Sequence, residues 1–155
     1  MVKKKYNTDI RLCLMILHIG DKYRLIVDVM NDCFDKNYKA CYKGWYQLNK
    51  YKRTSAWFPK IADLSYGTPR PGDKNYGWFN TMSDDGNHIY MNNYENPNLL
   101  NKEQTQGIEP TITFLKLPYS DYYQYAGVFT RTRRDPKLGW VFDRIAQDID
   151  TSEYL

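Results

Sequence analysis

The sequence predicts an α+β domain in which two N-terminal helices pack on a curved, mostly antiparallel sheet or an open β-barrel. Two observations lead to this fold class. The segment 8–35 has the apolar spacing of helices, whereas the chain after Asp35 consists of short aromatic and β-branched runs separated by Gly, Pro, Asn and Asp. Helices come first and strands follow, so the alternation that a doubly wound parallel sheet requires is missing.

The first helix is expected to begin at Asn7 or Thr8, which can cap it, and to end at Gly20. This stretch is apolar nearly all round, so periodicity leaves open that it is a buried strand. Asp21 can cap the second helix. The apolar residues of that helix recur at helical spacing, and they are Tyr23, Ile26, Val27, Met30 and Phe34.

Seven strands are expected in the rest of the chain, because each run is rich in residues that favour strands and is bounded by turn residues. The turn SDDG at 83–86 predicts a hairpin that Gly86 closes with a positive φ, and RDPKLG at 134–139 predicts a second. Gly127 indicates a β-bulge. The polar segment 93–109 is expected to be a long excursion. The strands are predicted at about 38–47, 55–62, 76–82, 87–92, 110–117, 122–131 and 139–146.

The length of 155 residues fits one domain, 1–155, with flexible ends expected at 1–7 and 148–155. A net charge of +4 is too small for bulk neutralisation of nucleic acid and favours a local basic patch. Three cysteines without a C-x-x-C pair indicate neither a disulfide framework nor a zinc site, and this favours a reducing, cytoplasmic location. No apolar stretch is long enough to span a bilayer, so we expect no membrane association.

Motifs for catalysis are missing. His18 and His88 stand alone, without H-E-x-x-H, and the chain has no G-x-S-x-G, no G-K-[ST] phosphate loop and no G-x-G-x-x-G. Asp84 and Asp85 could supply carboxylates to a metal, but beside Gly86 they are typical turn formers. The sequence therefore favours a protein that is not an enzyme, with no catalytic residue, no metal site and no cofactor.

The segment 37–60, NYKACYKGWYQLNKYKRTSAWFPK, contains six Lys or Arg and seven aromatic residues but no Asp or Glu. In a strand over 38–46, Tyr42 would lie on an aromatic face, and Lys43 and Trp45 on the opposite face. Rings stack on bases and cations neutralise phosphates, so this pattern favours a nucleic-acid surface. The open alternative is a core strand with one buried and one solvated face.

Further cations and one amide extend this hypothesis. Arg70 lies in TPRPGD, and Arg131, Arg133 and Arg134 end a predicted strand, so separate loops carry positive charge. Asn80 lies on the strand that enters the hairpin, and its amide can bind a base edge if it faces a pocket. The chain also has four tryptophans, at 45, 57, 78 and 140, more than we expect to be purely structural.

The stretch RPGDKNYGWF at 70–79, followed by YQYAGVFT and WVFDRIA, resembles the PUA-like superfamily, which includes the EVE, ASCH and SRA domains. The resemblance implies a twisted barrel with flanking helices that recognises nucleic acid, or a flipped, modified base, in an aromatic pocket. It also implies a turn of Arg70, Gly72 and Asp73 at the pocket rim, with Trp78 and Phe79 as pocket aromatics. The chain departs from the pattern where KNYG follows the turn in place of a continuous apolar strand.

We therefore predict a nucleic-acid-binding reader domain, for DNA rather than RNA, that recognises a modified or flipped base and has a restriction-type enzyme as a candidate partner. One alternative is a small-molecule nucleotide-binding protein that sequesters a signal, and a second is a nuclease accessory subunit. The predicted binding residues are Tyr42, Lys43, Trp45, Trp57, Arg70, Asp73, Trp78, Asn80, Arg131, Arg133 and Arg134.

Overall fold

The computed structural model describes residues 15–50, 53–63, 77–101 and 108–155. One large sheet dominates these residues, in the strand order β3-β4-β7-β8-β9-β6-β5. Neighbouring strands are antiparallel, except that β4 and β7 are parallel. The strands are β3 (Trp45–Asn49), β4 (Thr54–Trp57), β5 (Trp78–Met82), β6 (His88–Asn93), β7 (Thr111–Leu115), β8 (Tyr123–Asp135) and β9 (Gly139–Ala146).

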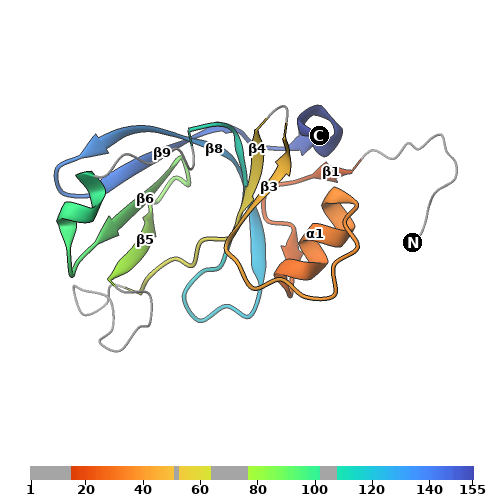
Figure 1. Ribbon diagram of the computed structural model, residues 1–155, viewed down its shortest axis with the longest axis horizontal. Helices are drawn as coiled ribbons and strands as arrows, with labels where there is room; N and C mark the ends of the chain where they lie inside the picture. The colour runs from red at the N-terminus through yellow and green to blue at the C-terminus, as the bar shows by residue number, and fades with distance from the viewer. Residues whose placement is uncertain (1–14, 51–52, 64–76, 102–107) are drawn as a thin grey trace, which may run out of the picture.

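Short elements complete the fold at both ends of the sheet (Figure 1). Strand β2 (Lys22–Tyr23) pairs with β8, and β1 (Ile16–Leu17) pairs with β10 (Ile149–Asp150) in a separate two-stranded sheet. The helix α1 (Ile26–Phe34) lies beside β1 and β3. Two 3₁₀ segments, η2 (Pro97–Asn101) and η3 (Thr151–Tyr154), follow β6 and β10.

The prediction of a mostly antiparallel, curved sheet is confirmed, but two N-terminal helices are not found. The described residues contain one α-helix, which corresponds to the second predicted helix and begins at Ile26. Asp21 does not cap it, because the carboxylate of Asp21 accepts a hydrogen bond from the amide of His18 and closes a tight turn at Gly20. Where the first helix was expected, residues 16–17 form β1, and 8–14 lie outside the described residues.

The strand predicted at 38–47 begins only at Trp45. Tyr38 is held instead against α1, because the side chain of Asn31 bonds both the amide and the carbonyl of Tyr38. The other six predicted strands are present, and β8 runs on to Asp135. The hairpin at 83–86 is confirmed, with Gly86 at φ 76°.

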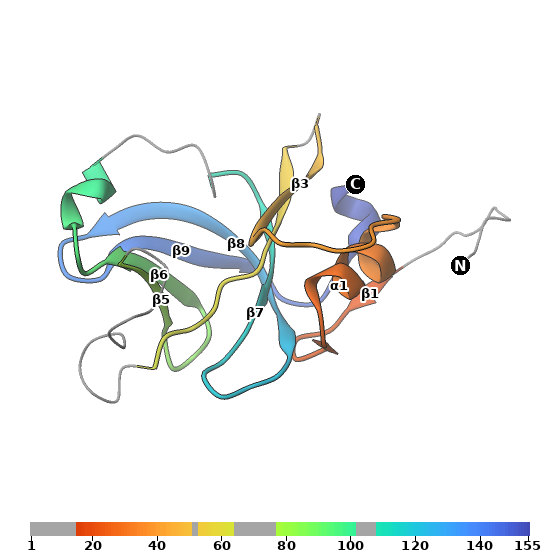
Figure 2. The ribbon, with the colours of Figure 1, turned by 60° about the horizontal axis from the view of Figure 1, so that its bottom comes forward.

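The glycine predicted to mark a bulge lies at one. The β7–β8 register steps from Thr113 opposite Gly127 to Phe114 opposite Tyr125, which leaves one extra residue on β8. A Cβ on Gly127 would lie 2.7 Å from the carbonyl oxygen of Ala146, so the site also needs the missing side chain. The bulge sharpens the bend of β8, the long strand that arches across the molecule in Figure 2.

The sheet curls until its distant strands meet. Strands β4 and β9 are separated by β7 and β8, about 14 Å if the sheet were flat, yet the rings of Trp57 and Phe142 lie 4.6 Å apart. Beyond β4, Ile61 forms a bridge with Asn80 of β5, and the amide of Ala62 donates to the carbonyl of Asn80 at 2.8 Å. We call the surface enclosed by this curl the inner face.

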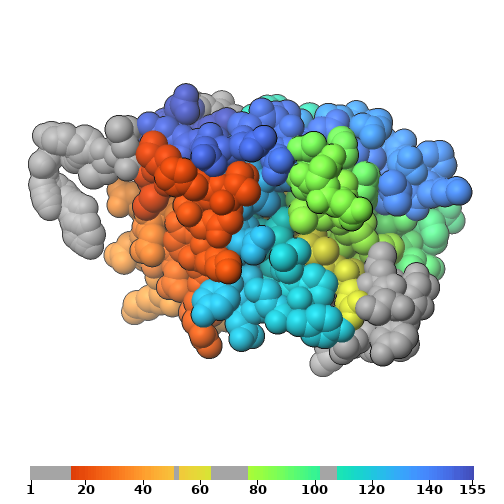
Figure 3. Space-filling model, turned by 180° about the vertical axis from the view of Figure 1, so that it is seen from behind, coloured from red at the N-terminus to blue at the C-terminus, as the bar shows by residue number. Residues whose placement is uncertain are grey.

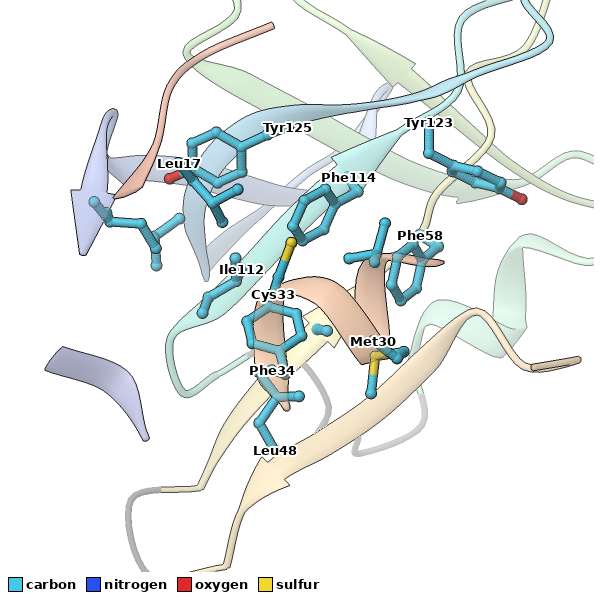
Figure 4. Packing of buried hydrophobic residues seen from close by; sticks show 14 residues of the cluster. Leu17, Met30, Cys33, Phe34, Leu48, Phe58, Ile112, Phe114, Tyr123 and Tyr125 are labelled. Carbon is cyan, nitrogen blue, oxygen red and sulfur yellow. The ribbon is translucent and has the colours of Figure 1, made fainter. Parts of the chain in front are cut away.

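Two hydrophobic clusters fill the fold. The helix-side cluster packs α1 against β4, β7 and β8, and Phe114 at its centre contacts the rings of Phe34, Phe58 and Tyr125 (Figure 4). The ring of Tyr23 also packs edge-on against Phe114. The inner-face cluster consists of Trp57, Ile89, Leu115, Ala126, Phe129 and Phe142.

Residues 148–155 were expected at a flexible end. In the structure Ile149 is buried in the helix-side cluster, and the carboxylate of Asp148 accepts a bond from the amide of Ile19. This end of the chain therefore packs against the N-terminal strands. Residues 1–7 lie outside the described residues.

Candidate functional site

The inner face carries a row of three side chains across β5, β6 and β9. Asn80 pairs with Met91, and Met91 pairs with Trp140, so all three project from the same side of the sheet. Trp78 shares this side because it lies two residues before Asn80 on the same strand. All four side chains are half-buried, so the row is neither sealed core nor open surface.

A second row lies deeper in the curl. Phe142 pairs with Ile89, and both are fully buried. Trp57 covers Phe142, and Trp45, opposite Trp57 on β3, packs its ring 5.5 Å from that of Trp57. Trp57 is only 5% exposed, whereas Trp45 is half-buried. Trp57 therefore acts as a floor residue, and Trp45 is the indole at the edge of this cluster.

The guanidinium of Arg131 lies beside this row on the inner face. Arg131 pairs with Phe142 across β8 and β9, and its guanidinium lies 4.3 Å from the ring centre of Trp140. Such a cation–π contact contributes about 0.5–2 kcal/mol, more when it is desolvated. Burial lowers the pKa of Arg131, but a guanidinium remains charged at neutral pH. The site thus combines an indole face with a fixed positive charge.

Two buried polar atoms of the first row have no hydrogen-bond partner, and these are Oδ1 of Asn80 and Nε1 of Trp140. The Asn80 amide nitrogen has only a long bond, 3.5 Å, to the carbonyl of Lys60. An unsatisfied buried polar group costs about 1–3 kcal/mol. One acceptor and one donor, left unpaired in the same cross-strand row, are what a polar ligand would satisfy.

Five of the predicted binding residues therefore share the inner face: Trp45, Trp57, Trp78, Asn80 and Arg131. Sequence reasoning did not select Met91 and Phe142, and it counted Trp140 only as one of four tryptophans. The alternation within β6 and β9 places these residues on one side of each strand. Only the strand order brings those sides together.

The other predicted residues of the described ranges are exposed, and among them Arg134, which pairs with Trp140, projects from the side of the inner face. The Tyr42 ring is 92% exposed in a segment without secondary structure, and Lys43 lies over the ring of Tyr46 at 5.1 Å. The terminal arginines of β8 diverge: Arg133 contacts Asp143 at 3.4 Å, and Arg134 donates to Asn101. The three arginines thus do not form one cluster. Arg70 and Asp73 lie outside the described residues.

The outer side of the same strands carries a polar cluster around Asp143. Its carboxylate lies 2.6 Å from Nδ1 of His88 and accepts a 2.7 Å bond from the hydroxyl of Thr132. Partial burial opposes ionisation, but these two bonds and the charge of Arg133 together lower the pKa of Asp143. In contrast to the unpaired atoms of the inner face, both oxygens of the Asp143 carboxylate have a hydrogen-bond partner. Within the described ranges, no group of three or more His, Cys, Asp or Glu side chains is arranged to hold a metal ion.

A strongly curled, mostly antiparallel sheet with one flanking helix and an aromatic, partly polar inner face defines a PUA-like domain, which confirms the resemblance seen in the sequence. The sequence model of the SET and RING associated (SRA) domain matches residues 14–151, nearly the whole chain. The chain therefore belongs to the SRA domain family.

A solved structure supports this assignment. The chain is similar to "The 5-Hydroxymethylcytosine-Specific Restriction Enzyme AbaSI", with 25% sequence identity and a TM-score of 0.66. The similarity covers 84% of this chain but only 40% of AbaSI, so the chain spans less than half the length of that enzyme. No curated protein matches the chain. In the part of the chain that the structure describes, no helix has the length and apolar character needed to cross a membrane.

Proposed function

We propose that this chain is a DNA-binding domain that reads a modified cytosine on its inner face. The observation that carries the proposal is the pair of unpaired atoms, Oδ1 of Asn80 and Nε1 of Trp140, in one row of an SRA domain. Because this face lies inside the curl, the base has to leave the helical stack to reach it.

The two unpaired atoms suit a hydroxyl group. A hydroxyl both donates and accepts, so it can donate to Oδ1 of Asn80 and accept from Nε1 of Trp140. A methyl group can do neither. AbaSI is described as specific for 5-hydroxymethylcytosine, and this supports the same base as the first ligand to test. Trp78 and Met91 would supply the apolar walls for the ring.

Four further predicted residues are proposed to contact the DNA backbone. Tyr42, Lys43, Arg133 and Arg134 are exposed, and cations on the surface neutralise phosphates in a sequence-independent and salt-dependent way. In this proposal the inner face discriminates between bases, whereas these four exposed residues contribute affinity for any DNA.

The experiment is fluorescence anisotropy with labelled duplexes that differ at one position, which is cytosine, 5-methylcytosine or 5-hydroxymethylcytosine. We expect the hydroxymethylated duplex to bind about 5- to 30-fold more tightly than the methylated one, because one or two good hydrogen bonds are each equivalent to about 1 kcal/mol. Equal binding of all three duplexes at low salt would reject base reading, and no binding at all would reject DNA as the ligand.

Matched variants assign the discrimination to the row. Trp140→Phe removes the indole Nε1–H but retains an aromatic ring, and Asn80→Leu removes the acceptor but retains the volume. Each variant should reduce the preference for the hydroxymethyl group and leave binding to unmodified DNA unchanged. Thr81→Val, on the opposite side of β5, is the control and should change neither.

The length comparison supports a partner. Because the chain spans 40% of AbaSI, we propose that it directs a restriction-type nuclease on another chain or domain to modified DNA. Co-purification of DNA cleavage activity with the tagged domain tests this. The cytoplasmic location remains a prediction from the unpaired thiols, which include Cys33 and Cys41.

A further inference from the structure

The loop between β7 and β8 contains a residue in an unfavourable conformation. Tyr119 has φ 65°, and the amide of Ser120 donates to the carbonyl of Leu117 at 3.1 Å, which closes a tight turn. Pro118 and Tyr119 are its two central residues. A turn with Pro in the first central position and a positive φ in the second ordinarily has Gly or Asn there, because a bulky side chain is strained. The chain therefore has a large aromatic side chain at a position where the backbone conformation favours Gly or Asn.

The ring of Tyr119 is not buried by this arrangement, since the side chain is 80% exposed. Its hydroxyl donates to the carboxylate of Asp63 across the sequence. Within the described ranges, the other non-glycine residues with positive φ are Asp35, directly after α1, and Arg53, directly before β4. Neither presents a ring to solvent. Most of the surface of the Tyr119 side chain therefore remains accessible to a ligand.

The position of Tyr119 connects it to the inner face. Asp63 follows Ala62, whose amide donates to the carbonyl of Asn80, and Ile61 bonds to the carbonyl of Lys116 just before the turn. The loop after β7 and the segment after β4 lie side by side in Figures 2 and 3. Tyr119 is therefore anchored one residue away from the backbone contact that fixes Asn80, at the edge of the inner face.

We propose that Tyr119 is a stacking platform for a second nucleobase, one that neighbours the base held on the inner face. This inference rests on the proposed function. An exposed ring held by a strained turn and by the bond to Asp63 is pre-organised, so it loses little conformational freedom when a base stacks on it. Stacking of one base on an aromatic side chain is equivalent to about 1–3 kcal/mol, which corresponds to a fold-change of about 5 to 150 in affinity.

The test compares two ligands and three variants. The ligands are a duplex containing 5-hydroxymethylcytosine, measured by anisotropy, and the free nucleoside 5-hydroxymethyl-2′-deoxycytidine, measured by ligand-observed NMR. Tyr119→Gly removes the ring and relaxes the turn, and Tyr119→Phe retains the ring but loses the bond to Asp63. Tyr94→Ala, an exposed tyrosine whose ring lies against Phe79 on the outer side of β5, is the matched control.

We expect Tyr119→Gly to weaken duplex binding about tenfold, to leave nucleoside binding unchanged and not to lower the melting temperature. Tyr119→Phe and Tyr94→Ala should retain duplex affinity within about threefold. The inference is overturned if Tyr119→Gly binds the duplex like the unchanged chain, or if duplex and nucleoside affinity fall together, since the ring would then only shape the inner face. If the unchanged chain binds neither ligand, the proposed function itself fails.

Discussion

The two hydrophobic clusters of this domain differ in how fully their side chains are buried and in whether their polar atoms have hydrogen-bond partners. In the helix-side cluster, Phe114 is fully buried and every ring around it packs on another. On the inner face, Trp78 and Trp140 are half-buried, Arg131 lies over an indole, and two polar atoms have no partner. The first cluster therefore holds the fold together, whereas the second retains polar atoms without partners, to which a ligand can bond.

The largest expected effect separates the clusters by stability. Phe114→Ala removes a buried ring and should lower the free energy of unfolding by about 3–5 kcal/mol. Trp78→Ala, on the inner face, removes a half-buried ring and should cost about 1–2 kcal/mol, because part of that surface is already in water. Urea denaturation measures both. Equal losses would contradict the division of the two clusters into a structural and a functional one.

Asn80→Leu distinguishes a functional from a structural role of the inner face, because stability and binding should change in opposite directions. Removal of a buried acceptor without a partner should raise the free energy of unfolding by about 1 kcal/mol. Affinity for the hydroxymethylated duplex should fall about tenfold at the same time. A thermal melt and an anisotropy titration on the same sample provide the two readouts, and a loss of stability would show that the amide serves the fold.

Arg131→Met tests the charge of the inner face. The variant retains an apolar side chain over Trp140 but loses the guanidinium. We expect weaker binding to modified and unmodified duplexes alike, and a decrease of about 1 in the slope of log affinity against log salt. If only modified DNA binds more weakly, Arg131 contacts the base and not the phosphates.

The smallest effect concerns the satisfied polar cluster on the outer side. Because the pKa of Asp143 is lowered in the fold, its ionised form stabilises the protein above the unfolded value of 3.8. This stabilisation is lost as the pH falls through the lowered folded pKa. Asp143→Asn should therefore melt at a lower temperature at pH 7, and the gap to the unchanged protein should narrow below about pH 4. A gap that widens in acid would contradict the assigned sign.

Local patterns in the sequence predicted the strands well because alternation and turn residues act over a few positions. They predicted the hairpin at Gly86 and the bulge at Gly127, and they selected Trp45, Trp57 and Asn80. They failed where a hydrogen bond to one particular side chain overrides the pattern. Asn31 holds Tyr38 out of β3, and the turn at Gly20 replaces a helix cap.

The arrangement of the inner face could not be predicted because it depends on contacts between strands that are far apart in the sequence. The row from Asn80 to Trp140 depends on β6 lying between β5 and β9, a strand order that no local pattern specifies. The separation of Arg131 from Arg133 depends on an irregular register between β8 and β9 at these residues. The three arginines were predicted to form one cluster, although Arg131 and Arg133, which pair with the consecutive residues Phe142 and Val141, face opposite sides of the sheet.

The indole signals in a proton–nitrogen NMR spectrum test the central claim most directly, because each of the four tryptophans reports on its own Nε1–H. On addition of a duplex with 5-hydroxymethylcytosine, we predict a large shift of the Trp140 signal, a smaller shift for Trp78 and little change for Trp57, which is buried beneath the site. The unmodified duplex should leave Trp140 nearly unchanged. If DNA shifts only amides of the outer side, such as those of His88 and Asp143, the inner face is not the binding site.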